Sequence, residues 1–161
     1  MAVGASCALS GILLGARLIE RVKDLENAQA VILAIVNRLS FTLASPEILI
    51  AEMAYESQFK RCDYLSLASE EISKGSEFID GWKNSVSKSN SCLSHDDRAI
   101  LAQVGDILGC SDIDTQLGNL NLLIQRLKFA ADGARERSAS DCKLAKTLGA
   151  LTGFAVVVMI I

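Results

Sequence analysis

The sequence predicts an all-α fold, a helical bundle of about six helices whose first and last helices extend into N- and C-terminal transmembrane segments. Three observations predict it. Apolar residues recur at spacings of three, four and seven through most of the chain, as on one face of a helix. Aromatic residues make up only 5% of the 161 residues, so strong strand formers are few. All 16 basic and 19 acidic residues lie between Arg17 and Lys146, which leaves both ends of the chain apolar.

The apolar ends define three regions: an N-terminal transmembrane segment at 1–19, a helical bundle domain at 20–146 and a C-terminal transmembrane segment at 147–161. Crossing a bilayer takes about 20 apolar residues, so both segments are short for a span. The first segment reaches that length if Arg17 snorkels its charge to the lipid surface. A signal peptide is the alternative for the first segment, but it has no basic start. A buried core helix is the alternative for the last, but FAVVVMII is apolar on every face.

Basic residues flank both apolar segments on their inner sides. They are Arg17, Arg21 and Lys23 after the first segment, and Arg135, Arg137, Lys143 and Lys146 before the last. Positive residues next to a membrane span stay on the cytoplasmic side. We therefore expect the bundle domain to face the cytoplasm from a cell membrane.

Each apolar segment also contains a GxxxG pattern, Gly11–Gly15 in the first and Gly149–Gly153 in the last. Small residues four apart let two helices approach closely in lipid, so these glycines are candidates for membrane helix packing. The alternative is that glycine is simply frequent in membrane helices.

The first helix is expected to continue from the apolar end to about Leu43 without a break. A second helix begins after Ser45, because serine is a good N-cap and Pro46 suits the first helical position. We expect it to end near Tyr55.

A third helix is predicted over Tyr64 to Lys74, with Gly75 as its C-terminal stop. A fourth begins at Ser76. The segment from Lys83 to Ser94 is rich in serine and asparagine, and we interpret it as a fraying helix end followed by a loop.

A fifth helix is predicted from His95 to about Leu108. Ser94 and Asp97 have the spacing of a capping box, in which each side chain bonds the other residue's backbone N–H. The sixth and longest helix starts at Ile113 and continues through Leu144 into the last apolar segment.

The most distinctive stretch is the corner between the fifth and sixth helices. Gly105 in mid-helix costs about 1 kcal/mol relative to alanine, which suits a place where another helix crosses closely. Gly109 fits a left-handed C-terminal stop, and Ser111 or Asp112 fits the cap of the next helix. Gln116 is placed to reach back toward that cap. These five residues form a structural signature.

This stretch resembles the stage III sporulation protein AB family of endospore-forming bacteria, whose members show a segment of the form LGxxLGxSDxxxQ. The matching residues are Val104-Gly105, Leu108-Gly109, Ser111-Asp112 and Gln116. Valine replaces the first leucine, and the serine-rich segment is a further departure. The whole layout is also similar, with an N-terminal anchor, a helical domain and a long last helix.

The resemblance implies a structural role in the channel complex between mother cell and forespore. Family members are similar to the cytoplasmic domains of the inner-membrane platform protein of type II secretion machines. We therefore expect a membrane-anchored assembly platform in the mother-cell membrane, in contact with a cytosolic ATPase and other proteins of the channel. A homo-oligomer is compatible with this layout. The alternative is a membrane-tethered helical sensor or regulator that dimerises through its GxxxG segments.

No residues are assigned to catalysis, to a cofactor or to a metal. His95 is the only histidine, and Asp96 and Asp97 are expected to serve as first-turn acids. Five cysteines show no metal-binding spacing and are expected to be reduced thiols: Cys7, Cys62, Cys92, Cys110 and Cys142. The net charge of −3 and the lack of a basic run predict no binding to nucleic acid.

Overall fold

The computed structural model describes the backbone of residues 2–41, 44–109 and 112–160, and the side chains of residues 16–41, 44–109 and 112–140. Within these ranges it contains six α-helices, one short 3-10 helix and no strand, so the predicted all-α class is confirmed. The elements are α1 (Ala2–Phe41), α2 (Pro46–Ala54), η1 (Ser57–Phe59), α3 (Asp63–Ser73), α4 (Phe78–Lys88), α5 (His95–Leu108) and α6 (Ile113–Ile160).

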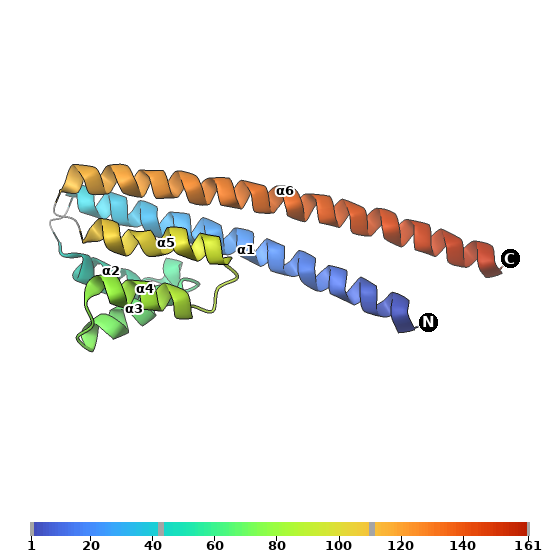
Figure 1. Ribbon diagram of the computed structural model, residues 1–161, viewed down its shortest axis with the longest axis horizontal. Coiled ribbons are helices and arrows are strands. Elements are labelled where there is room, and N and C mark those ends of the chain that lie inside the picture. The colour runs from blue at the N-terminus through green and yellow to red at the C-terminus, as the bar shows by residue number, and fades with distance from the viewer. Residues whose placement is uncertain (1, 42–43, 110–111, 161) are drawn as a thin grey trace.

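The two long helices, α1 and α6, run antiparallel side by side, and α5 packs against α6 (Figure 1). The shorter helices α2, α3 and α4 form a second layer that closes on α1 and α5. We call the end where α1 enters the bundle and α6 leaves it the base, at residues 17–24 and 135–140. The opposite end, where α1 ends at Phe41 and α6 begins at Ile113, is the tip.

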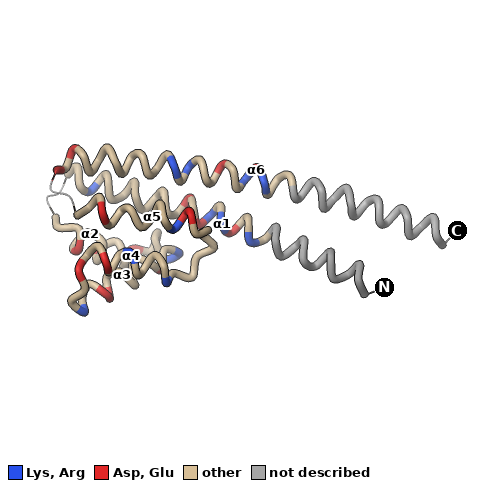
Figure 2. Tube along the Cα trace, viewed as in Figure 1, with Lys and Arg blue, Asp and Glu red and all other residues tan. Residues whose placement is uncertain are grey.

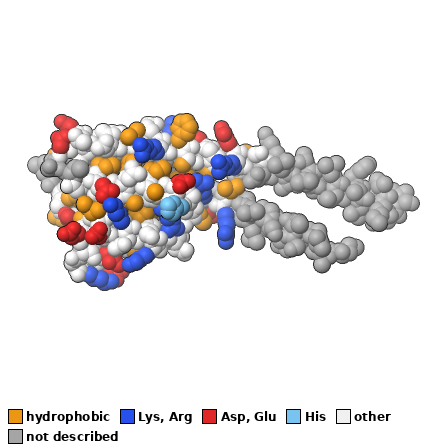
Figure 3. Space-filling view, viewed as in Figure 1, with side chains coloured by type: hydrophobic (Ala, Val, Ile, Leu, Met, Phe, Trp, Pro, Cys, Tyr) orange, Lys and Arg blue, Asp and Glu red, His pale blue; other side chains and the backbone are white. Residues whose placement is uncertain are grey.

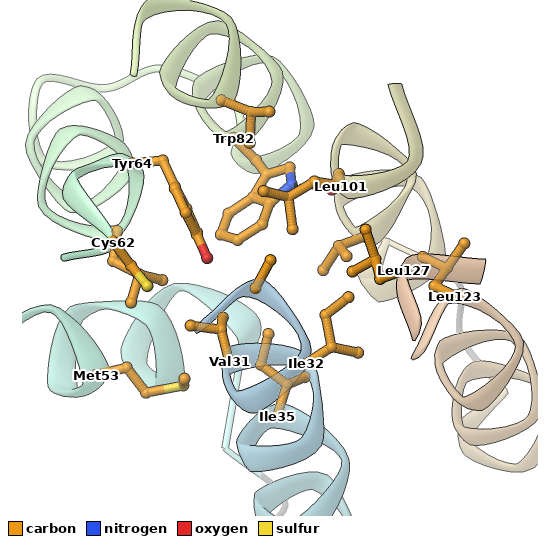
Figure 4. Close-up of a cluster of buried hydrophobic side chains, with 14 of the residues drawn as sticks. Val31, Ile32, Ile35, Met53, Cys62, Tyr64, Trp82, Leu101, Leu123 and Leu127 are labelled. Atoms are coloured by element: carbon orange, nitrogen blue, oxygen red, sulfur yellow. Dashed lines mark hydrogen bonds between the residues drawn. The ribbon is translucent and has the colours of Figure 1, made fainter. Parts of the chain in front are cut away.

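The core lies between these two layers. Side chains from all six α-helices converge there, and Trp82 is the largest that is fully buried (Figure 4). The α1 contribution follows the helical period, with Leu25, Ala28, Ile32 and Ile35 all fully buried. Burying this apolar stripe against α6 and the short helices stabilises the bundle, since helices of 9 to 14 residues such as α2 to α5 are marginal in isolation.

Most predicted helix boundaries are confirmed within two residues. Gly75 ends the third helix with a positive φ of 96°, as a glycine stop requires. Ser45 has the extended backbone of an N-cap before Pro46, but its hydroxyl makes no capping hydrogen bond. The predicted capping box is present, because Ser94 Oγ accepts from the N–H of Asp97 and the Asp97 carboxylate accepts from the N–H of Ser94.

The prediction for the serine-rich segment was wrong in part, because α4 continues to Lys88 as a regular helix. Its serines do not compete with the helix. Ser85 is buried and donates its hydroxyl to the carbonyl of Gly81, one turn earlier. Together with Trp82 and Val86 it forms the buried face of α4, which holds this part of the segment helical.

The apolar ends stay predictions. No helix has a long enough apolar stretch to cross a membrane among the residues whose side chains are described. Most of the predicted segment 1–19 and all of 147–161 lie outside those residues (Figure 2). The same holds for the glycine pairs Gly11–Gly15 and Gly149–Gly153.

Candidate functional site

Most of the sequence signature lies at the end of α5 and the start of α6, with Gly105 in the last turn of α5. A Cβ atom on Gly105 would lie 3.1 Å from Trp82 Cδ1 and 3.4 Å from Trp82 Cβ. The close helix crossing predicted for this glycine is therefore present, with α4 as the crossing helix. The Trp82 indole also donates from Nε1 to the carbonyl of Leu101, at 2.9 Å, which ties α4 to α5 (Figure 4).

Replacing Gly105 with leucine is expected to destabilise the bundle by about 1–3 kcal/mol, because the added side chain would overpack against Trp82. Gly118 is the matched control, since a Cβ there would meet nothing within 4 Å. Gly118→Leu should be neutral or stabilising, as leucine is the better helix former. The measurement is urea denaturation of the full chain in mild detergent, followed by circular dichroism. Equal midpoints for the two variants would contradict the close packing.

Gly109 does not adopt the predicted left-handed conformation. Its φ of −75° and ψ of −10° are right-handed, so the prediction of a left-handed stop was wrong. The reason for glycine is space: a Cβ on Gly109 would lie 3.0 Å from Ile79 Cδ1. Both glycines of the signature therefore let α4 approach α5 closely. Gly109 faces Ile79 in the first turn of α4, and Gly105 faces Trp82 one turn further along α4.

Asp112 caps α6, which confirms one of the two predicted caps. Its carboxylate accepts from the backbone N–H of Thr115 at 3.1 Å and from the Thr115 hydroxyl. These hydrogen bonds, first of all the one from the hydroxyl, hold the pKa of Asp112 below its ordinary value. Ser111, the other candidate, lies outside the described residues.

Gln116 reaches the end of α5. Its side-chain Nε2 donates to the carbonyl of Leu108 at 3.4 Å, and the residue is 93% buried, with 7% of its surface exposed. A carbonyl in the last turn of a helix has no partner within the helix, so this bond satisfies an orphan acceptor. The described residues of the signature thus tie the end of α5 to the start of α6.

A second site, at the base, was not predicted from the sequence. Arg21 on α1 forms two hydrogen bonds to Asp97 at the start of α5, from Nε to Oδ2 at 2.8 Å and from Nη2 to Oδ1 at 3.1 Å. The Asp97 side chain is only 2% exposed and that of Arg21 is 21% exposed. Burial by itself raises the pKa of Asp97, but the bonds from Arg21 and Ser94 outweigh it and leave the pKa lowered. The capping box predicted from Ser94 and Asp97 thus also locks α5 to α1.

Arg98, the next residue, organises the loop between α4 and α5. Its guanidinium donates to five backbone carbonyls of that loop and of the end of α4. They belong to Val86, Ser87, Ser89, Ser91 and Leu93. Five donors in a fixed fork fit this set of acceptors, which no lysine could match.

Two aspartates hold the same loop from other helices. Asp63 at the start of α3 accepts from the N–H of Asn90, and Asp24 on α1 accepts from the N–H of Cys92, both at 2.8 Å. Arg61 in turn binds Asp24 at 3.1 Å and Glu20 at 2.7 Å. The base is therefore a cross-linked polar layer that fixes α1 relative to α3, α4 and α5.

Neither site assembles a reactive constellation within the described residues. His95 is 99% exposed, and its only acidic neighbour in reach, Asp96, lies 3.9 Å away and is 97% exposed (Figure 3). No three potential metal ligands gather in the part of the chain that the structure describes. Cys62 is buried and Cys92 is exposed, and both are free thiols; burial raises the pKa of Cys62.

Two shallow grooves lie on the part of the surface that the structure describes. One lies between α1 and α6 at the base, has a volume of about 380 Å³ and is lined by Ile19, Val22 and Ala139. The other lies between α5 and α6, has a volume of about 290 Å³ and is lined by Ile107, Leu122 and Arg126 among others. A band of hydrophobic side chains surfaces along this second groove (Figure 3). Both are open troughs rather than enclosed pockets.

Comparison with known proteins agrees with this architecture. None of the curated proteins compared with the chain matches it. A solved structure, stage III sporulation protein AB (SpoIIIAB), matches with a TM-score of 0.64 at 18% identity, covering 74% of this chain and 97% of that one. At this identity the match shows the shared fold. The sequence profile of stage III sporulation protein AB matches residues 1–161, the whole chain. The chain therefore belongs to the stage III sporulation protein AB family and takes part in sporulation.

Proposed function

We propose that the chain is a membrane-anchored assembly platform of the channel between mother cell and forespore, required for endospore formation. Family membership over the full length is the observation that carries the proposal. On this proposal the chain does no covalent chemistry. It holds other proteins of the channel in place, among them a secretion-type cytosolic ATPase.

The architecture supports the anchoring part of the proposal. The two long helices that carry the bundle have apolar ends, and because they are antiparallel both ends point away from the same side of the bundle (Figure 1). We therefore assign 1–19 and 147–161 as transmembrane segments and 20–146 as the cytoplasmic domain. The basic residues at the base, such as Arg17 and Arg137, favour the cytoplasmic side.

The polar layer at the base supports a structural role. Ion pairs and backbone hydrogen bonds connect α1 to the short helices directly next to the proposed anchor. A bundle that is rigidly joined to its anchor keeps cytosolic partners in a fixed position relative to the membrane. A flexible linker would let that position vary.

Thiol labelling tests the topology. In a variant that keeps only Cys92, a membrane-impermeant maleimide should react only after the membrane is opened, because Cys92 is exposed on a cytoplasmic domain. A variant that keeps only Cys62 is the matched control and should stay unlabelled in both conditions, as this thiol is buried with a raised pKa. Labelling of Cys92 in intact cells would overturn the orientation.

Gene deletion tests the role itself. We expect a clean deletion to arrest spore development, and the full chain to pellet with membranes and co-purify with a secretion-type ATPase. Normal sporulation of the deletion strain would overturn the platform. A sensor or regulator that dimerises through Gly11, Gly15, Gly149 and Gly153 is the alternative, and it depends on residues outside the described side chains.

A further inference from the structure

The flank of the bundle carries an apolar surface along the groove between α5 and α6. Ile107 lines this groove from α5, and Leu122 and Leu123 line it from α6 (Figure 3). Leu122 is 50% exposed, and Phe129, seven positions further along α6, is 85% exposed. Residues seven apart lie on the same side of a helix, so the apolar surface continues from the groove along α6 toward the base.

Arg126 lies within this apolar surface and has no acidic partner. It lines the groove, is exposed, and follows Leu122 by four positions on the same side of α6. Its guanidinium donates to the Gln103 side chain at 3.5 Å, a long bond to a neutral group. None of the ion pairs among the described side chains includes it. Asp106, which also lines the groove, is bound by Lys83 at 2.6 Å, so the positive charge of Arg126 is not neutralised.

Two glycines extend this surface at its ends. Gly118 precedes Leu122 by four positions and Gly133 follows Phe129 by four, and a Cβ atom on either glycine would meet nothing within 4 Å. Packing within the chain therefore gives no reason for them, although glycine inside a helix costs about 1 kcal/mol relative to alanine. Such positions let another backbone approach closely. The stretch between the two glycines is about 22 Å long, which is the length of about four turns of a docked helix.

We propose that this flank docks an amphipathic α-helix of another protein, with apolar residues one and two turns apart and an aspartate or glutamate beside them. The apolar residues would cover Ile107, Leu122 and Phe129, and so recover the free energy that their exposure to water costs. The carboxylate would pair with the Arg126 guanidinium. This proposal rests on the platform function, since a platform has to hold other proteins. It adds the docking face and the chemistry of the partner.

Two other occupants fit this flank less well. Copies anchored in one membrane stand parallel, so a two-fold contact through the same surface would place Arg126 of one copy against Arg126 of the other. A bilayer at the base would not cover a surface that runs along α6 away from the proposed anchors. The helix of another protein avoids both problems, because its carboxylate faces Arg126 and its length follows the groove.

Photocross-linking of the full chain in sporulating cells tests the docking face. A benzoyl-phenylalanine in place of Phe129 should cross-link one protein other than this chain, at a peptide with apolar residues in helical spacing and an acid beside them. The same probe in place of Leu33, which is 51% exposed on α1, is the matched control and should not yield that product. A cross-link from position 129 to lipid or to a second copy, or none at all, would overturn the docking face.

Charge reversal tests the acidic partner. Arg126→Glu should lower the yield from position 129 about tenfold, because it repels a carboxylate. Lys128→Glu, at an exposed position of the same helix that does not line the groove, should leave the yield unchanged. If reversal weakens the fold, Arg126→Gln should still lower the yield, and an unchanged yield in that variant overturns the acidic partner.

A charge swap completes the test. Replacing the acid of the cross-linked peptide with lysine should restore the yield with Arg126→Glu and lower it with the unchanged chain. Failure to restore it would show that this acid does not face Arg126. Membrane pelleting keeps the two proposals apart: a chain that pellets but shows no specific product from position 129 disproves the docking face alone, whereas a chain that does not pellet disproves the platform.

Discussion

Replacing Trp82 with alanine is expected to destabilise the protein by about 3–5 kcal/mol, because truncation of a buried aromatic side chain leaves a cavity. Trp82 is fully buried, and its ring meets Tyr64 edge-on with ring centroids 5.7 Å apart. Truncation would open a cavity between α3, α4 and α5 and leave the carbonyl of Leu101 without its 2.9 Å bond from the indole. The measurement is the free energy of unfolding by urea in mild detergent, followed by circular dichroism because the variant has no tryptophan.

Trp82→Phe separates the two losses. It keeps most of the ring volume but removes the indole N–H, so the expected cost is about 1–3 kcal/mol. A loss below 1 kcal/mol for Trp82→Ala would mean that α4 does not dock on α5 as described.

Replacing Asp97 with alanine is expected to cost about 3–5 kcal/mol, because it leaves the part-buried Arg21 without its carboxylate partner and removes half of the capping box at α5. Asp96→Ala is the matched control. The carboxylate of Asp96 is 97% exposed, so its loss should change stability by less than about 0.5 kcal/mol. A double-mutant cycle with Arg21→Met should show a coupling of at least about 1 kcal/mol. Independent effects of the two substitutions would show that the ion pair contributes nothing.

The same carboxylate makes stability depend on pH on the acid side. The pKa of Asp97 in the folded protein lies below its ordinary value of 3.8. Its contribution is therefore complete at neutral pH and is lost as the pH falls below that value toward the folded-state pKa. Asp97→Asn should give a flatter acid limb of stability than the wild type. Parallel acid limbs for the two proteins would contradict the role of this group.

Helices and their ends could be predicted from the sequence because the signals for them are local. The period of Leu25, Ile32 and Ile35, the capping box at Ser94 and the glycine at position 75 each act over a few residues. The need for space at Gly105 could also be inferred, since a mid-helix glycine has a known cost. The partner that fills that space, Trp82, could not be identified, because 23 positions separate the two residues.

The polar layer at the base could not be predicted for the same physical reason. Arg21 and Asp97 are 76 positions apart, and nothing in either local sequence distinguishes this pair from a solvent-exposed charge. At Gly109 the local sequence predicted a conformation that the packed structure does not have. A glycine after a helix usually signals a left-handed stop, but here the approach of Ile79 requires the missing side chain, and only the packed helices reveal it.

The hydrogen bonds from Arg98 to the loop between α4 and α5 affect which substitutions that loop can accept. The guanidinium binds main-chain oxygens, and Asp63 and Asp24 bind main-chain amides. These bonds therefore do not depend on which side chain the loop residue carries. Exposed side chains of the loop can therefore be replaced without loss of these bonds, whereas Ser89 and Leu93 are buried and are constrained by their own packing. Proline at position 90 or 92 would remove one of these amide hydrogens and with it the bond to Asp63 or Asp24.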